Sequence, residues 1–468
     1  MSGELLIACS PGELWAALVQ DDKLAALRVL RAGADARLGE VFLGRVAALK
    51  PDLPAALIDI GTERLGFLSA EDAVSPAGFA GLHEGQVVVV QVVKEAREDK
   101  ATGLSMRLRL VGRALELTPA RPGIGAEKTL GEEERSRLAG LLDRIARPGE
   151  SFKLRKAASG ASAAMLEEEA ETLRARWRRI ETESRAGAPP RRLEESVSPV
   201  VLALEEFAPA LPDAILIDDG AACGEARRWL ARHRPELAER VSHYRETPPL
   251  FEDRGIAGDI ATVLASRVPL AGGGSLLIEE TAAATMIDVD MGSAGSRGRD
   301  AERAILTANL AAATEVARQI RLRGLAGPIV VDFIGMRRRE QRERVRETLA
   351  AALAGEAEVL GWTRLGHLEL VRRRRQAPLA ELLFERAPDG GRIKTALTVA
   401  LEALRALARE AAAAVPRAPV LHLHPEVAAA LDGPGRAARQ ELEQRLGRPV
   451  ATVSEPGRAR EAFDLRLG

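Results

Sequence analysis

The two stretches Thr285-Met-Ile-Asp-Val-Asp290 and Gly327-Pro-Ile-Val-Val-Asp-Phe-Ile334 decide the fold. Both are short apolar runs, which are typical of buried strands. Between them, Arg299 to Arg323 repeats apolar residues at helical spacing and stops at Gly324, a residue common just after a helix end. Strand, helix and strand in this order predict a βαβ unit, whose handedness rule makes the two strands parallel within one sheet.

Each of these strands carries an acid near its carboxyl end, Asp288 with Asp290 on the first and Asp332 on the second. Functional groups collect at this edge of α/β sheets. Residues two apart face the same side of a strand, so Asp288 and Asp290 should project together, with Asp332 roughly 5–10 Å away on a neighbouring strand. Crowded carboxylates repel unless a hard cation joins them. The pattern therefore predicts a magnesium site suited to phosphodiester hydrolysis.

A plainer interpretation of each acid is a turn residue at a strand end or a helix cap. Asp59, Asp218 and Asp219 also end predicted strands, so a strand-end aspartate is not by itself a site. Three acids at one edge of one sheet, in contrast, indicate a functional site.

Composition narrows the class of protein. The chain has 468 residues and a net charge of −1, which indicates several domains and excludes a uniformly cationic nucleic-acid binder. No apolar run reaches the length of a membrane span, and the first residues do not have the pattern of a signal peptide. Cys9 and Cys223 are the two cysteines, too few for a disulfide framework, so we expect a cytoplasmic protein without a membrane partner.

Alternating apolar and polar residues predict antiparallel strands over 4–34, with turns at Ser10-Pro-Gly12 and Asp21-Asp22. Five short strands with glycine turns between 39 and 113 predict a small barrel of the OB type. Residues 119–210 read as helical and charged. From 211 onward strands alternate with helices, and the last fifty or so residues read as a small strand–helix–strand module.

With these elements in place, the chain resembles the ribonuclease E/G family. The resemblance extends over almost the whole chain, and the shared order of its motifs makes it specific. The motifs are Ala55-Ala-Leu-Ile-Asp-Ile-Gly-Thr-Glu-Arg-Leu-Gly-Phe-Leu68, Pro249-Leu-Phe251, Gly272-Gly-Gly-Ser-Leu-Leu-Ile-Glu-Glu-Thr281, Ile287-Asp-Val-Asp290, Asn309-Leu310, Ala317-Arg-Gln-Ile-Arg-Leu-Arg323, Ile329-Val-Val-Asp-Phe-Ile334, His424-Pro-Glu-Val427 and Phe463-Asp464.

The resemblance implies a multi-domain α/β fold. Its parts would be an RNase H-like subdomain interrupted by an OB-fold RNA-binding domain and a helical 5′-sensor region, then a DNase I-like catalytic subdomain and a small C-terminal α/β module. The RNase H-like subdomain would comprise 1–35 and 211–280, and the OB-fold domain 36–115. The 5′-sensor region would be 116–210, the catalytic subdomain 281–390 and the C-terminal helix and module 391–468.

The resemblance also implies a magnesium-dependent endoribonuclease that cuts single-stranded RNA and leaves a 3′-hydroxyl and a 5′-phosphate. Asp288 and Asp332 would hold the magnesium, with Asp290 as a third catalytic residue. The family usually has Asn at the position of Asp290, so an extra negative charge stands where a phosphate approaches.

Two further departures concern zinc and the RNA 5′ end. The family's Cys-x-x-Cys pair, which joins two subunits through zinc, is missing from Leu382-Leu-Phe-Glu-Arg-Ala-Pro-Asp-Gly-Gly391, so we expect no zinc and at most a homodimer without a zinc link. The family's 5′-phosphate pocket uses Arg and Thr, whereas this chain has Arg155-Lys156. Charge still suits a phosphate, but the plainer interpretation is a solvated basic pair beside a turn.

RNA would also contact Phe67, Arg337 and Arg338. Phe67 matches a stacking aromatic of the family, and its usual aromatic partner is Leu57 here; the alternative is a residue of the barrel core. Arg337 and Arg338 follow Asp332, and Arg372 to Arg375 forms a second basic run. Such runs suit an RNA backbone, although many are merely solvated faces.

Other functions remain open at this stage. A non-catalytic RNA-binding protein of the same fold would keep the barrel and lose cleavage, and the changes at Asp290 and Lys156 favour it. A third possibility is an unrelated metal-dependent enzyme on this scaffold. The presence of both Asp288 and Asp332 favours the nuclease.

Overall fold

The computed structural model describes most of the chain, in two compact units. One unit is Met1–Gly33 with Ser198–Gly468, and the other is Ala34–Val197. The described residues are 3–31, 38–50, 52–62, 64–74, 78–96, 101–119, 123–127, 130–194, 198–207, 212–281, 283–292, 299–374, 377–387, 390–413 and 419–467.

The first unit begins with a mixed five-stranded sheet. The strand order is β15-β14-β1-β2-β3, in which β1, β2 and β3 form an antiparallel meander and β14 and β15 add in parallel. Glycine at Gly12 and left-handed backbone at Asp21 and Asp22 make the two turns, which confirms the turns predicted there. The strands are β1 (Gly3–Ser10), β2 (Glu13–Gln20), β3 (Lys23–Arg31), β14 (Ala214–Ile217) and β15 (Val241–His243).

Helices cover both faces of this sheet, which explains its nearly continuous apolar strands. On one face Leu5 and Ile7 pack with α3 and α4. On the other face Leu6 packs with residues from α6, α8 and α10. The helices around the sheet are α3 (Pro199–Phe207), α4 (Gly220–His233), α5 (Pro235–Ala238), α6 (Leu250–Asp253), α7 (Ala257–Thr262) and α10 (Leu379–Leu383).

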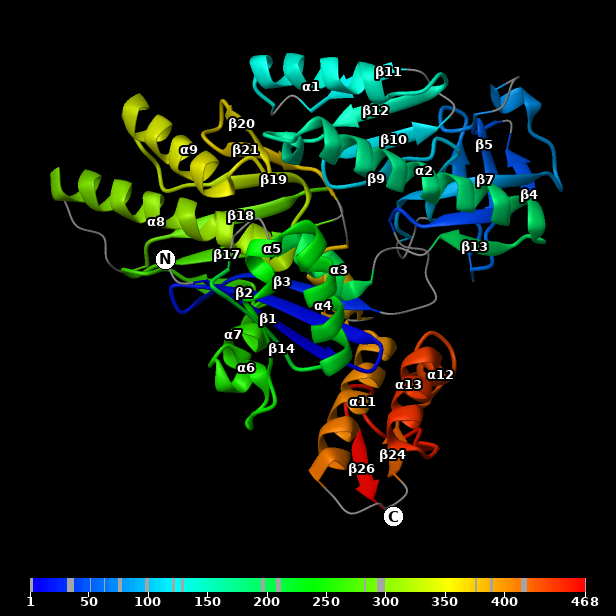
Figure 1. Ribbon diagram of the computed structural model, residues 1–468. Helices are drawn as coiled ribbons and strands as arrows, with labels where there is room; N and C mark the ends of the chain where they lie inside the picture. Colours follow the sequence, from blue (N-terminus) through cyan, green and yellow to red (C-terminus); the bar gives the residue numbers. More distant parts are fainter. Residues whose placement is uncertain are drawn as a thin grey trace. The chain divides into compact units, whose positions relative to one another are not determined.

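A six-stranded sheet in the same unit has the order β16-β17-β18-β19-β21-β20. The β18 and β19 strands are parallel and α8 joins them, so the predicted βαβ unit is confirmed. The α8 and α9 helices lie along one face of the sheet (Figure 1), and their apolar residues form its core. The elements are β16 (Arg267–Pro269), β17 (Ser275–Glu280), β18 (Thr285–Asp290), α8 (Arg299–Arg323), β19 (Gly327–Asp332), α9 (Arg339–Leu353), β20 (Glu358–Trp362) and β21 (Leu368–Arg372).

The last part of this unit is a small α/β module. The β24 strand pairs with β25 in parallel and with β26 in antiparallel orientation, and the helices α11, α12 and α13 pack on these strands. The α12 helix and β26 are additions to the predicted strand–helix–strand pattern. The elements are β22 (Phe384–Arg386), β23 (Arg392–Lys394), α11 (Ala396–Ala413), β24 (Pro419–Leu423), α12 (Pro425–Asp432), α13 (Arg436–Leu446), β25 (Ala451–Ser454) and β26 (Asp464–Leu467).

The second unit contains a closed five-stranded barrel of the kind found in OB-like domains. Its strand order is β4-β5-β6-β8-β7, and pairing of β4 with β7 closes it, while β13 adds outside β4. The barrel elements are β4 (Val41–Lys50), β5 (Ala55–Asp59), β6 (Gly66–Ser69), η1 (Gly78–Gly81), β7 (Val87–Lys94), β8 (Gly103–Ser105) and β13 (Arg191–Glu194).

The rest of the second unit corrects the expectation that 119–210 is only helical. A four-stranded sheet of order β11-β12-β10-β9 packs with α1 and α2 around one core. Two of these strands are short, so the long charged helices dominate the sequence pattern. The elements are β9 (Leu110–Val111), β10 (Leu115–Pro119), β11 (Gly123–Ala126), α1 (Glu132–Ile145), β12 (Glu150–Leu154), η2 (Lys156–Ala158) and α2 (Ala163–Ala186).

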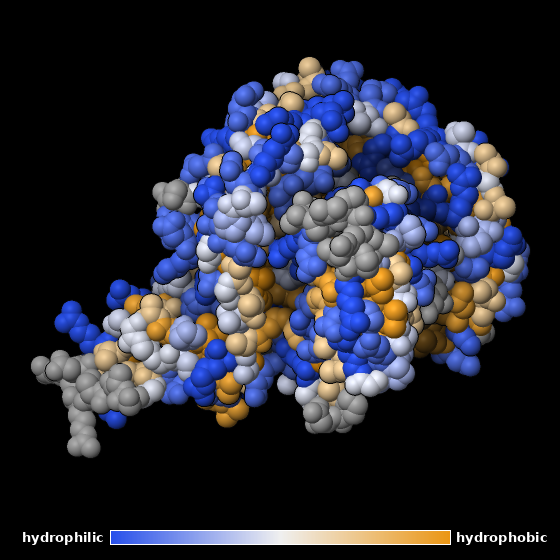
Figure 2. All heavy atoms as spheres, turned by 90° about the horizontal axis from the view of Figure 1, so that it is seen from below, coloured by the Kyte–Doolittle hydropathy of each residue, from blue (hydrophilic) through white to orange (hydrophobic). Residues whose placement is uncertain are grey.

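The surface is mixed in character. On the face drawn in Figure 2, hydrophilic residues predominate and apolar residues show between them in patches. Among the helices that the structure describes, none combines the length and apolarity needed to cross a membrane.

Candidate active site

Strand register brings the two predicted metal-binding acids opposite each other. Asp288 on β18 is the direct partner of Asp332 on β19, and neighbouring strands lie about 4.7–4.9 Å apart. Along β18 the buried residues Ile287 and Val289 alternate with the exposed Asp288 and Asp290, because successive side chains point to opposite faces. The buried residues pack against the helices, so the acids lie on the open face of the sheet.

Asp290 is held differently from the other two acids. Its Oδ1 accepts a hydrogen bond from the Gly292 amide at 2.8 Å, and its Oδ2 lies 3.7 Å from Arg267 Nη1. Arg267 also donates to Ser275 Oγ at 2.7 Å. The carboxylate of Asp290 therefore closes the turn after β18 and is partly neutralised by a cation, which offsets the extra negative charge expected there.

His367 is a neighbour of the site that the sequence reasoning missed. Its Nε2 lies 3.7 Å from Asp332 Oδ2. The residue ends the turn between β20 and β21, where its backbone amide donates to Thr363 Oγ1 at 3.2 Å. Nothing in the local sequence distinguishes this histidine, because its closeness to Asp332 arises from the pairing of β19 with β21.

The donor set suits one hydrated cation better than a protein cage. Over the residues that the structure describes, no three or more His, Cys, Asp or Glu side chains converge as a metal site. Magnesium is usually bound through one or two carboxylates and keeps several waters. Two exposed carboxylates in register, Asp288 and Asp332, match that coordination chemistry.

A buried asparagine fixes the chain just beyond Asp332. Asn309 on α8 is fully buried. Its Nδ2 donates to the carbonyl of Ile334 at 2.8 Å, and its Oδ1 accepts from the amide of the same residue at 3.1 Å. These two hydrogen bonds to the N–H and C=O of one residue define the path of the backbone directly after β19. Asn309 is therefore a positioning residue for the Asp332 end of the site.

The basic residues near the site divide into two groups. Arg337 is exposed, and Arg338 pairs with Glu302 at 3.2 Å with its side chain 66% exposed, so both remain accessible to a polyanion. Arg372 instead donates to the carbonyls of Ile320 and Leu325, and burial lowers its pKa.

Arg372 therefore joins the end of α8 to β21, whereas both interpretations of the run from Arg372 to Arg375, an RNA-backbone surface or a solvated face, assumed a free cation at this position. Arg374 pairs with Glu381 at 3.0 Å. Arg375 lies outside the described residues.

Phe67 lies on the barrel surface rather than in its core. Its strand neighbours Gly66 and Leu68 are buried, whereas Phe67 is half-buried, and its cross-strand partner is the half-buried Leu57. Leu68, in contrast, belongs to the barrel core. An aromatic ring beside an aliphatic side chain on an outer face is a platform on which a base can stack.

The basic pair Arg155-Lys156 follows β12, but the loop around it is not an open anion cradle. The guanidinium of Arg155 donates to the carbonyls of Gly112 and Arg113. The amide of Lys156 donates to Glu127 Oε2 at 2.9 Å.

The amide of Gly160 likewise donates, to Glu134 Oε1 at 2.7 Å. Protein carboxylates therefore already occupy the amides of Lys156 and Gly160, so these two amides do not face an anionic ligand. The exposed ammonium of Lys156 remains available to a phosphate.

The chain with this fold belongs to a known class of protein. A model of the ribonuclease E/G family matches residues 109–375, and together with a full-length relative at 31% identity this shows that the chain belongs to the ribonuclease E/G family. This membership makes the chain an endoribonuclease.

The individual relatives are of two kinds. Ribonuclease G of Haemophilus influenzae is 31% identical over 486 aligned residues, covering 99% of each chain, and ribonuclease G of Escherichia coli K12 is 28% identical over 99% of each. Ribonuclease E of Haemophilus influenzae is 31% identical, covering 88% of this chain and 46% of its own length.

Proposed function

We propose that this endoribonuclease cuts single-stranded RNA in RNA processing and decay, with magnesium held by Asp288 and Asp332. The observation that carries the proposal is the direct register of these two carboxylates on the open face of a sheet. Magnesium bound there would supply Lewis-acid activation and charge neutralisation for phosphodiester hydrolysis. The products would be a 3′-hydroxyl and a 5′-phosphate.

The chain's own residues would bind and orient the RNA around that point. Arg337 and Arg338 offer exposed guanidinium groups to backbone phosphates. His367 Nε2 lies 3.7 Å from Asp332 Oδ2, beside that carboxylate. In the other unit, Phe67 would stack on one base.

We further assign subdomain types from strand order. The sheet β15-β14-β1-β2-β3, with β2 antiparallel and helices on both faces, would be the RNase H-like subdomain. The sheet that carries Asp288 and Asp332 would be the DNase I-like catalytic subdomain, and the barrel would be the OB-fold that binds RNA. The free thiols of Cys9 and Cys223 suit a reducing, cytoplasmic setting.

The direct test is incubation of purified protein with a 5′-monophosphorylated, A/U-rich single-stranded oligonucleotide, with magnesium and with EDTA. Cleavage with magnesium that EDTA abolishes supports the proposal. Binding of the oligonucleotide without cleavage under any divalent cation would favour the non-catalytic RNA-binding alternative, in which Asp290 obstructs the phosphate.

We predict modest sensing of the RNA 5′ end. Lys156 adds an exposed cation beside Arg155, and a terminal monophosphate has more charge than an internal phosphodiester. The nearby Glu127 and Glu134 hold the loop amides and oppose a phosphate, so monophosphorylated RNA should be cut only a few-fold faster than hydroxyl-ended RNA.

Lys156→Ala should remove that difference and leave cleavage of long substrates unchanged. Arg155→Ala should also remove it, with some loss of stability because two carbonyl contacts disappear. Initial rates on paired substrates that differ only at the 5′ end measure this effect. Lys153→Ala, an exposed cation on β12, is the matched control, and equal rates on both substrates for the unmutated protein would contradict the prediction.

We predict that the purified protein contains no stoichiometric zinc and that any homodimer survives chelators. The segment where the family has its paired cysteines contains none. Its described residues form the end of α10, the strand β22 and part of the turn that leads to β23. The Ala387 amide closes this turn by donating to the Gly391 carbonyl at 2.8 Å. Elemental analysis with light scattering before and after EDTA checks this, and one zinc per two chains would refute it.

A further inference from the structure

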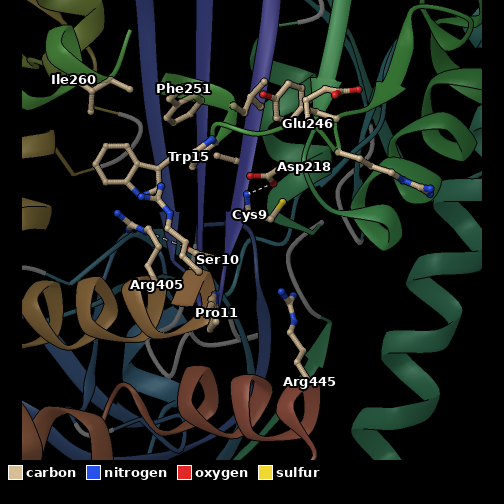
Figure 3. A pocket seen from close by; sticks show the side chains of 17 residues that line it. Cys9, Ser10, Pro11, Trp15, Asp218, Glu246, Phe251, Ile260, Arg405 and Arg445 are labelled. Carbon is tan, nitrogen blue, oxygen red and sulfur yellow. Dashed lines mark hydrogen bonds between the residues drawn. The ribbon is translucent and has the colours of Figure 1, made fainter. Parts of the chain in front are cut away.

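A cavity of about 440 Å³ opens beside the ends of β1 and β14, and none of the proposed catalytic acids lines it. This volume is within the range of small-molecule sites. Figure 3 shows Trp15 and Phe251 on one side of the cavity and Asp218 with Cys9 on the other. Arginines from α11 and α13, among them Arg409 and Arg445, complete the lining.

Two acids line this cavity, Asp218 and Glu246, and Asp218 is the one beside Cys9. Its Oδ1 accepts from the Cys9 amide at 2.7 Å. Burial, with a contribution from the neighbouring Asp219, raises the pKa of Asp218 to about 6. An ionised Asp218 is therefore a cost to the folded chain, and Asn would keep the hydrogen bond to Cys9 without that cost. Costly ionisable groups in cavities are characteristic of binding and catalytic sites.

The aromatic wall is rigidly held. Trp15 Nε1 donates to Glu13 Oε2 at 2.6 Å, and the guanidinium of Arg405 lies over the Trp15 ring, 5.4 Å from its centroid. Arg405 also pairs with the buried Glu13. A ring that is fixed in this way offers the face that Arg405 does not cover to a stacked heterocycle, at little entropic cost.

Two arginines of the cavity, Arg409 and Arg445, are loosely paired. Arg409 lies 3.5 Å from Glu252, and its side chain is 55% exposed. Arg445 Nη2 lies 3.5 Å from Asp219 while it also contacts Glu441 at 2.6 Å. Exposed ion pairs of this kind contribute little to stability, so these guanidinium groups can turn to a phosphate without a large loss.

We propose that this cavity binds a purine nucleotide, with guanine preferred. The base would stack against Trp15 and Phe251, its N1–H and exocyclic N2–H groups would donate to the Asp218 carboxylate, and its phosphate would contact Arg409 and Arg445. Adenine presents an acceptor at N1, so it cannot make the same pair with a carboxylate. The inference does not depend on the proposed cleavage reaction.

Calorimetric titration of the full chain with guanosine 5′-monophosphate tests the proposal, with adenosine 5′-monophosphate, guanosine and inorganic phosphate as comparisons. We expect saturable binding of guanosine 5′-monophosphate, at least about tenfold weaker binding of the adenine nucleotide, and none of phosphate alone. Asp218→Asn should weaken guanine-nucleotide binding at least about tenfold. Arg409→Ala should weaken the binding of guanosine 5′-monophosphate but not the binding of guanosine.

Arg232→Ala, an exposed arginine of α4, is the control and should bind as the unmutated protein does. Circular dichroism on every variant shows whether the fold is intact. A short RNA with a terminal guanosine separates the two sources of ligand, because its affinity falls in Asp218→Asn only if the RNA end occupies the cavity. No nucleotide binding, equal binding of phosphate, or unchanged binding by Asp218→Asn would overturn the proposal.

Discussion

Asp332→Asn is expected to lower the rate of RNA cleavage by on the order of 10³-fold or more while RNA affinity stays nearly unchanged. A metal ion contributes several kcal/mol to transition-state stabilisation, and about 1.4 kcal/mol corresponds to a tenfold change in rate. Asn removes one of the two carboxylate charges that face each other across β18 and β19. Affinity should persist because contacts to the RNA backbone and bases come from other residues.

Single-turnover cleavage and filter binding on the same oligonucleotide measure the two quantities separately. Asp288→Asn should behave in the same way. Glu279→Gln is the matched control, since it neutralises an exposed carboxylate on the neighbouring β17 strand that has no proposed role. If Asp332→Asn cleaves at the rate of the unmutated protein, or if Glu279→Gln loses as much activity, the metal assignment is wrong.

The periodicity of apolar residues in the sequence predicts much of the fold, because burial of one face of each helix or strand imposes that periodicity. The bounds of β18 and α8 agree with the sequence prediction, since one face of each packs into a single core. The register of Asp288 with Asp332 follows from two strands of the same kind joined by one helix. The sheet β11-β12-β10-β9 was missed because β11 (Gly123–Ala126) has only four residues, two of them glycines that are uncommon in strands, and pairs with Phe152 and its neighbours in β12.

The parts of the site that escaped sequence reasoning depend on contacts between distant segments. His367 reaches Asp332 because β21 pairs with β19. Arg372 looks like one more cation of a basic run, yet its partners are the carbonyls of Ile320 and Leu325 at the end of α8. No local pattern distinguishes an arginine that binds a helix end from one that binds RNA, because both need only a charged fork at a strand end.

Asn309→Ala is expected to lower the free energy of unfolding of the first unit by about 2–4 kcal/mol, and to reduce cleavage in the protein that stays folded. The substitution leaves the part-buried amide and carbonyl of Ile334 without their partners, and an unsatisfied buried group costs roughly 1–3 kcal/mol. Ile334 is the second residue after Asp332, so loosening it misplaces a proposed metal ligand, and small displacements of such groups reduce rates strongly.

Urea unfolding gives the stability, and single-turnover rates at saturating magnesium and RNA give the effect on chemistry. Thr314→Ala is the matched control, because Thr314 is an exposed polar residue of the same helix whose hydroxyl bonds within α8. That control should change stability by less than about 0.5 kcal/mol and should leave the rate unchanged. A stable Asn309→Ala protein with full activity would show that the backbone after Asp332 is held by the sheet alone, since β19 would then keep the carboxylate in place without α8.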